Sequence, residues 1–264
     1  MREILGKYVQ GMKHADMHIH TVGSDGLLTA QNLVDLAVHH PFRIDVIVVT
    51  DHNTTVEAEK AREYALRNDY PIEVVIGEEI TTKEGHVLAI DIESPIPRGL
   101  SVEDTIRRIH RAGGLVIIPH PFYFSNFGLS IEEQTLLGIV HNPDLEVCAD
   151  AVEIFNSGVG DNKRSQANQR AQTFFLEHRE RLGAATAATD AHFHTIGRGI
   201  TAYSGGSLRE AIQARNTVAL ALEDHEAQVL RRFVVEFFGE EEVLHPKRKA
   251  QASLLERRQR RSTP

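Results

Sequence analysis

Residues 44–53 read I-D-V-I-V-V-T-D-H-N, an apolar run of strand length that ends directly on polar side chains. Apolar runs of this length bounded by polar residues are typical of β-strands. His52 follows the last strand residue, at the point where a barrel strand meets its loop. The stretch therefore predicts a strand that carries an imidazole to one end of a barrel.

Strand and helix patterns alternate along the rest of the chain. Strands are expected at 16–20, 44–50, 72–76, 86–91, 115–119, 151–155, 184–189, 200–203 and 217–222. Helices are expected at 29–40, 54–68, 101–112, 131–140, 163–182, from about 208, and near 226–238. Thr54 with Glu57 and Ser101 with Asp104 resemble capping boxes, and Gly183 closes the long helix. This alternation favours a parallel β/α barrel.

The boundaries and composition indicate an ordinary soluble protein. We expect one domain over residues 1–246 and a basic, mobile tail over 247–264. No apolar run is long enough to cross a bilayer and no signal peptide is visible, so the expected location is the cytoplasm. The net charge of -8 argues against broad attraction to nucleic acid. A single cysteine, Cys148, excludes a Cys-rich zinc site, whereas 15 histidines point to metal binding.

Candidate metal ligands recur where the expected strands end. His18 and His20 alternate along one strand, so both imidazoles can reach one ion. The other candidates stand at further strand ends or in the loops that follow them: Asp25, His52, Glu79, His86, His120, Asp190 and His192. Imidazole and carboxylate ligands suit Zn, Mn and Fe. The carboxyl ends of barrel strands are also where active sites lie.

The order D-x-H-x-H-x-x-x-S-D-G, T-D-H-N, G-x-E, P-H-P and D-x-H resembles the motif series of the polymerase and histidinol phosphatase (PHP) superfamily, over residues 16–192. The resemblance implies a distorted seven-stranded (β/α) barrel that holds two or three divalent ions. It further implies metal-dependent hydrolysis of a phosphate ester, with a metal-bound hydroxide held by Glu79, Asp190 and His192 as the nucleophile.

The resemblance also implies how the ligands divide among the ions. His18, His20 and Asp190 would hold one ion, and Glu79 would bridge it to a second ion bound by His120. The third site would consist of Asp25, His52 and His192. His86 is assigned to the second ion, and Glu79 is preferred to Glu78 because the G-x-E register fits Gly77.

Other polar residues have expected supporting roles. Asp16 and Asp51 stand beside ligand-bearing strand ends and are candidates to orient imidazoles by accepting their second N–H. Arg198 is the first candidate to bind the substrate phosphate, because a guanidinium can hold two phosphate oxygens. The further candidates for substrate contact are His194, Arg170 and Lys163, while Glu153 and Asn156 could line the pocket. The remaining histidines, His14 and His40 among them, are interpreted as surface residues.

Several functions fit this ligand set. The first expectation is a phosphomonoesterase acting on a small phosphorylated substrate, such as a nucleotide or a histidinol-phosphate-like metabolite. A phosphodiesterase or 5′-3′ exonuclease on short nucleic acid would use the same ligands, and the basic tail favours it. A barrel hydrolase of amides or lactones explains fewer motifs. A non-catalytic metal-stabilised scaffold conflicts with the intact ligand set.

Overall fold

The computed structural model describes residues 5–6, 11–123, 130–159, 161–222 and 232. Its strands are β1 (Leu5–Gly6), β2 (Lys13–Ile19), β3 (Val46–Val49), β4 (Glu73–Thr81), β5 (His86–Ile90), β6 (Leu115–Ile118), β7 (Ala151–Asn156), β8 (Ala184–Ala188), β9 (Gly199–Tyr203) and β10 (Thr217–Ala221). Its helices are α1 (Ala30–Val38), α2 (Val56–Arg67), α3 (Val102–Arg111), α4 (Glu133–Val140), α5 (Asp161–Leu182) and α6 (Leu208–Gln213).

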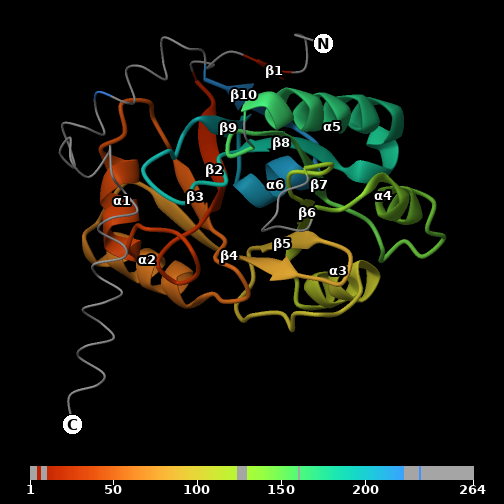
Figure 1. The fold of residues 1–264 in the computed structure, drawn as a ribbon. Helices are drawn as coiled ribbons and strands as arrows, with labels where there is room; N and C mark the ends of the chain where they lie inside the picture. Colours follow the sequence, from red (N-terminus) through yellow and green to blue (C-terminus); the bar gives the residue numbers. More distant parts are fainter. Residues whose placement is uncertain (1–4, 7–10, 124–129, 160, 223–231, 233–264) are drawn as a thin grey trace. The chain divides into compact units, whose positions relative to one another are not determined.

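The strands form one curled sheet in the order β1-β10-β9-β2-β3-β4-β5-β6-β7-β8 (Figure 1). The β8 edge returns towards β9, because the hydroxyl of Thr201 donates to Ala187 O at 2.9 Å and accepts from Ala187 N at 3.0 Å. Beyond the end of β2, Ile19 forms an isolated parallel bridge with Ala191. The sheet is therefore a nearly closed barrel.

The expected strand positions were correct, but the strand number and direction were not. Each of the expected strand segments coincides with one of β2 to β10, so the count of seven taken from the resemblance is wrong. The purely parallel barrel is also wrong, since β5 and β9 each run antiparallel to both of their neighbours. The loop of 82–85 between β4 and β5 is too short for a crossover, so these strands must pair as a hairpin.

One end of the barrel is filled by α6. Leu208, Ala211 and Ile212 of this helix pack with the apolar side chains of several strands, including Met17 and Tyr203. Ser207 begins the helix with a complete capping box, in which its side chain and that of Glu210 satisfy each other's backbone N–H. A packed plug at this end leaves the opposite end, where the parallel strands terminate, for a functional site.

The helix ends agree only in part with the sequence patterns. Ser101 caps α3 by accepting from Asp104 N, as expected. The expected capping box of Thr54 is wrong, because Thr55 is the N-cap of α2 and Glu57 accepts from Ala30 N instead. After α5, Gly183 has a φ of +69°, and a β-carbon at this position would overlap Asp150 O, so any side chain here would collide with backbone.

Apart from residue 232, the helix expected near 226–238 and the tail of 247–264 lie outside the described residues. Among the described helices, none combines the length and apolar character needed to span a bilayer.

Candidate metal centre

The barrel brings all nine candidate ligands to one end. They come from the ends of β2, β3, β4, β6 and β8, from the loop after β2 and from the start of β5. Four overlapping groups have ligand atoms within 4.8 Å of one another: His20, Asp25, His52 and His192; His18, His20 and Glu79; His18, His120 and Asp190; His52, Glu79 and His86. Donors separated by 174 residues in sequence thus converge on a single cluster.

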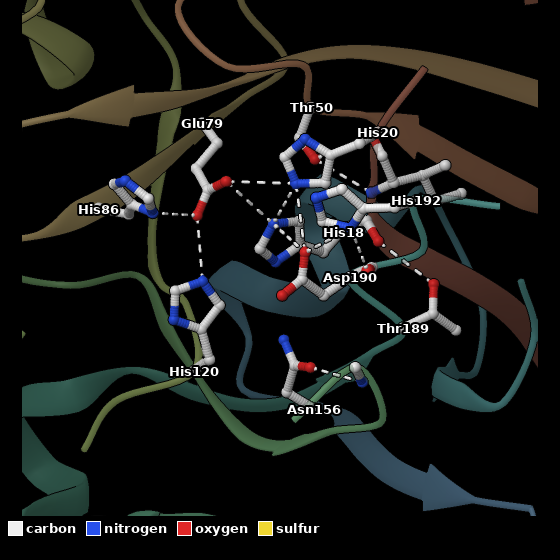
Figure 2. A network of polar contacts seen from close by, with 12 residues as sticks. His18, His20, Thr50, Glu79, His86, His120, Asn156, Thr189, Asp190 and His192 are labelled. Carbon is white, nitrogen blue, oxygen red and sulfur yellow. Dashed lines mark hydrogen bonds and ion pairs between the residues drawn. The ribbon is translucent and has the colours of Figure 1, made fainter. Parts of the chain in front are cut away.

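Glu79 lies at the middle of this cluster and is 1% exposed. Its Oε1 is 2.9 Å from His86 Nδ1 and 3.1 Å from His120 Nε2. Its Oε2 is 3.2 Å from His20 Nε2 and 3.4 Å from His18 Nε2. Figure 2 shows these contacts leaving the two carboxylate oxygens in different directions. Each oxygen therefore faces a different set of imidazoles, which is the geometry of a bridging carboxylate.

The neighbouring acid, Glu78, points away from the cluster. Its Oε2 accepts a hydrogen bond from Ile96 N at 2.8 Å, and the side chain is fully buried. Successive residues of a strand face opposite sides, so only one of the two acids can reach the imidazoles. The structure places Glu79 there, as the sequence register predicted.

The other ligand groups surround Asp190 and Asp25. Asp190 Oδ1 is 3.2 Å from His20 Nε2 and 3.5 Å from His18 Nε2. Asp25 Oδ2 is 3.2 Å from His192 Nε2 and 3.7 Å from His52 Nε2. His20 lies close to both acids, and the groups overlap, so the division of the ligands among ions stays a prediction.

Two ligands occupy an unusual backbone conformation. His120 has a φ of +28° and Asp190 has a φ of +52°. Residues other than glycine rarely adopt positive φ, and such strain concentrates at functional sites. Both residues lie two positions beyond the end of a strand, β6 or β8, where the chain turns into the following loop. The sharp turn explains how consecutive strand ends can point at one centre.

The second ring nitrogen of several imidazoles is anchored. His18 Nδ1 is 2.9 Å from Glu153 Oε1, and His192 Nδ1 is 2.9 Å from Asp190 O. His120 Nδ1 is 3.2 Å from the hydroxyl of Ser130, which itself donates to His120 O. Since these partners accept from Nδ1–H, each Nε2 retains a lone pair directed at the cluster. Such anchoring is typical of metal-ligating histidines.

The expected partners of Asp16 and Asp51 were wrong. Asp16 accepts from the hydroxyl of Thr189 at 2.7 Å and from Gly197 N at 2.9 Å, rather than from an imidazole. Asp51 accepts from Thr21 N and from the Ser24 hydroxyl, at 2.7 and 2.6 Å. Both acids therefore hold the loops that carry ligands, because buried hydroxyl and amide groups are the donors within their reach.

The sequence pattern singled out Glu153 but did not indicate its contact with a ligand. The residue was expected to line a pocket, but it is 1% exposed and contacts His18. Ser130 was not singled out at all. The available signal was an acid inside the apolar stretch Ala151–Asn156, since a buried acid requires hydrogen-bond donors.

Opposite charges shift the pKa values across the cluster. Burial lowers the pKa of His20, but Asp190 and Glu79 outweigh it and raise the value to about 9. Burial raises the pKa of Glu79, yet the imidazoles of His18 and His86 hold it well below its ordinary range. Burial raises the pKa of Asp16 to about 7 despite its hydrogen bonds. The ligands of the cluster thus attract positive charge strongly.

This donor set fits divalent transition metals. The facing atoms are imidazole nitrogens and carboxylate oxygens, and His18 Nε2 lies only 3.1 Å from His20 Nε2. Two lone pairs this close, both directed at Glu79 and Asp190, repel each other unless a proton or a cation lies between them. A cation would replace that proton, because metal binding and ligand protonation compete.

The candidate substrate residues are placed with differing detail. Arg170 Nη2 is 3.1 Å from Glu133 Oε2, and its guanidinium lies 4.4 Å from the ring centroid of Phe122, two residues beyond His120. Arg198 is half-buried next to Gly197, whose N–H reaches Asp16, and His194 is buried. The side chain of Lys163 lies outside the described residues. Substrate contact remains a prediction for all four.

Comparison with known proteins supports the resemblance. No protein-family model matches the chain. The uncharacterized protein MJ1587 of Methanocaldococcus jannaschii is 38% identical over 157 residues, which cover 54% of this chain and 81% of that protein. The 5'-3' exoribonuclease Rnm of Salmonella typhimurium is 39% identical over 99 residues, which cover 35% of this chain and only 33% of Rnm.

A solved two-domain protein from Bacteroides vulgatus, described as containing a predicted PHP-like metal-dependent phosphoesterase, has a similar fold. Its TM-score is 0.60 at 21% identity, over 82% of this chain and 67% of that chain. The chain is therefore similar in sequence to MJ1587 and in fold to this PHP-like protein.

Proposed function

We propose that this chain is a PHP-type phosphoesterase, which binds two or three divalent ions through its nine ligands and hydrolyses a phosphate ester. The observation that carries the proposal is Glu79, whose two oxygens face different imidazoles at 2.9 to 3.4 Å. A carboxylate so placed can serve two ions at once. Bound divalent ions activate water at neutral pH and neutralise phosphate oxygens during displacement.

The residues divide the binding among three positions. His18, His20 and Asp190 hold the first ion, and His86 with His120 hold the second, with Glu79 shared between them. Asp25, His52 and His192 hold the third. Asp190, a ligand of the first ion, and His192, a ligand of the third, lie next to each other, with Asp190 Oδ1 3.7 Å from His192 Nδ1. We propose that these two residues and Glu79 surround the position where water attacks the phosphate.

The chain's own residues then position the substrate. We propose that Arg198 binds phosphate oxygens, with His194, Arg170 and Lys163 as further contacts. Guanidinium groups suit this task because they hold two oxygens in one plane. Arg170 is half-exposed and stacked on Phe122, close in sequence to the ligand His120.

The proposed substrate is a small phosphomonoester. The net charge of -8 disfavours long nucleic acid, whose binding requires many basic contacts. A single terminal phosphate needs only the ions and one or two basic side chains. A nucleotide or a phosphorylated amino alcohol meets this requirement.

Exonuclease activity on short RNA is the second candidate, and similarity to Rnm favours it. One panel separates the two candidates: phosphomonoesters, cyclic and linear phosphodiesters, and 5′-phosphorylated oligoribonucleotides, each with Mn²⁺, Zn²⁺ or Fe²⁺. Release of inorganic phosphate alone supports the monoesterase, and release of nucleotides from RNA supports the exonuclease. If metal-loaded protein turned over none of these phosphate esters, both candidate functions would be excluded.

A further inference from the structure

Glu153 contacts two of the candidate ligands while lying outside every ligand group. Its Oε1 is 2.9 Å from His18 Nδ1. Its Oε2 accepts from His120 N at 2.8 Å and from Asn156 Nδ2 at 2.9 Å. The side chain thus joins the ends of β2 and β6, which supply ligands to different ions in the proposed function.

Irregular strands make this contact available. The pairing of β2 with β3 shifts between Asp16 and Ile19, so His18 lies within a bulge. The pairing of β7 with β8 shifts between Glu153 and Phe155. Bulges redirect side chains and are frequent beside active sites. Here two of them direct His18 and Glu153 towards each other.

The contact fixes the proton on His18. A buried carboxylate surrounded by donors accepts hydrogen bonds, so His18 must donate through Nδ1–H. In the neutral ring, which is the form that binds metal, the proton is then absent from Nε2, and Nε2 faces Glu79 Oε2 at 3.4 Å and Asp190 Oδ1 at 3.5 Å. The other oxygen of Glu153 meanwhile holds the N–H of His120, whose backbone has positive φ.

We propose that Glu153 is a positioning residue that keeps His18 in the metal-binding tautomer and fixes the backbone of His120. This role rests on the proposed function, since it requires that the cluster bind metal. Asn156 extends the network, because its backbone N–H donates to Asn168 Oδ1 of α5 at 2.9 Å. The long helix therefore supports the centre through Glu153.

A glutamine at position 153 has the same shape but cannot satisfy these contacts. If its oxygen faces His120 N and Asn156 Nδ2, its amide N–H faces His18 Nδ1 and drives the ring proton to Nε2. If its oxygen faces His18, its N–H groups oppose two donors. Either arrangement disturbs a ligand, so Glu153→Gln, which keeps the shape of the side chain but removes its charge, is a sharp test.

The chain offers a matched control in Asp150. This carboxylate also joins a histidine and a backbone amide, with Oδ2 at 3.0 Å from His110 Nε2 and 2.7 Å from Val116 N. Neither Asp150 nor His110 belongs to a ligand group. Asp150→Asn therefore repeats the chemical change away from the cluster.

The experiment titrates the full-length chain with Mn²⁺ and Co²⁺ alone, by calorimetry and by Co²⁺ visible absorption. We expect Glu153→Gln to bind at least one ion about 10- to 100-fold more weakly than wild type, with an altered Co²⁺ spectrum. Asp150→Asn should match wild type in both. Wild-type affinity and spectrum in Glu153→Gln would overturn the role alone, whereas wild-type protein that binds neither ion would overturn the proposed function with it.

A second measurement needs no variant and covers the case in which Glu153→Gln does not fold. Imidazole ¹⁵N spectra of zinc-loaded wild type should show His18 with its proton on Nδ1 and zinc on Nε2. A proton on Nε2, or zinc on Nδ1, would overturn the role.

Discussion

The two sides of the cluster differ in exposure. On the closed side, the side chains of His18 and His20 are 0% exposed and that of Glu79 is 1% exposed. On the open side, the side chains of Asp25 and His192 are 55% and 30% exposed. The closed side resembles a protein core, and the open side resembles a surface. Ions on the closed side should therefore be resident, while the open side admits solvent and substrate.

The anchoring of the ring nitrogens follows the same division. On the closed side, His18 and His120 are held by buried side chains, Glu153 and Ser130. On the open side, His192 is held by the carbonyl of its near neighbour Asp190. The contact of Glu153 with His18, 135 residues apart, makes the closed side depend on a distant strand, whereas the anchor of His192 lies within its own loop.

Removing the bridging charge should have the largest effect. Glu79→Gln leaves both pairs of imidazoles without their shared carboxylate, so we expect kcat/KM to fall by at least about 10³-fold. Elemental analysis should show the loss of at least one ion per chain. Glu78→Gln is the control, because Glu78 faces Ile96 N instead, and its ion content should equal that of wild type. Equal losses in both variants would contradict the assignment.

A change on the open side should have a smaller and more selective effect. Asp25→Asn weakens only the group that includes His52 and His192, so we expect loss of about one ion and a fall in kcat/KM of roughly 10- to 100-fold. The ions of the closed side should stay bound during dialysis. Asp69→Asn, at an exposed turn, serves as the control. Loss of every ion from Asp25→Asn would show that the two sides are not independent.

Changing Arg170 should affect binding slightly. Its ion pair with Glu133 is exposed, and its stacking on Phe122 is worth about 0.5–1 kcal/mol. We expect Arg170→Ala to raise KM by roughly 2- to 5-fold with little change in kcat. Arg62→Ala, on α2, should leave both constants unchanged. A large fall in kcat for Arg170→Ala would place this residue in the reaction itself.

The smallest expected effect is a difference between metal-free and metal-loaded protein in how Tm depends on pH. The pKa of Asp16 is raised from 3.8 to about 7 and that of His20 from 6.5 to about 9. Both groups bind protons more tightly when folded, so their stabilisation is lost as pH rises through these windows. The Tm of protein stripped of metal by a chelator should fall between about pH 5 and 9. The Tm of metal-loaded protein should not fall over this range, because metal affinity grows with pH. Parallel melting curves would contradict this.

The local patterns of the sequence were sufficient for the strand positions and for the side chains that gather in the cluster. Apolar runs followed by His, Asp or Glu identify a strand end directly, as at Ile44 to His52. Partners distant in sequence were not accessible in this way. Glu153 contacts His18, which is 135 residues away in the sequence, and Asp16 contacts Thr189, which is 173 residues away. The burial of His14 and His40, expected on the surface, was missed for the same reason.

The strand order has a consequence for biosynthesis. In the sheet β2 lies between β3 and β9, and β9 is complete only at Tyr203. A ribosome adding about 5–20 residues per second delivers His192 roughly 10–35 s after His18. During that interval the early histidines emerge without the carboxylate of Asp190. The full ligand set of the proposed ions therefore exists only after most of the chain has been translated.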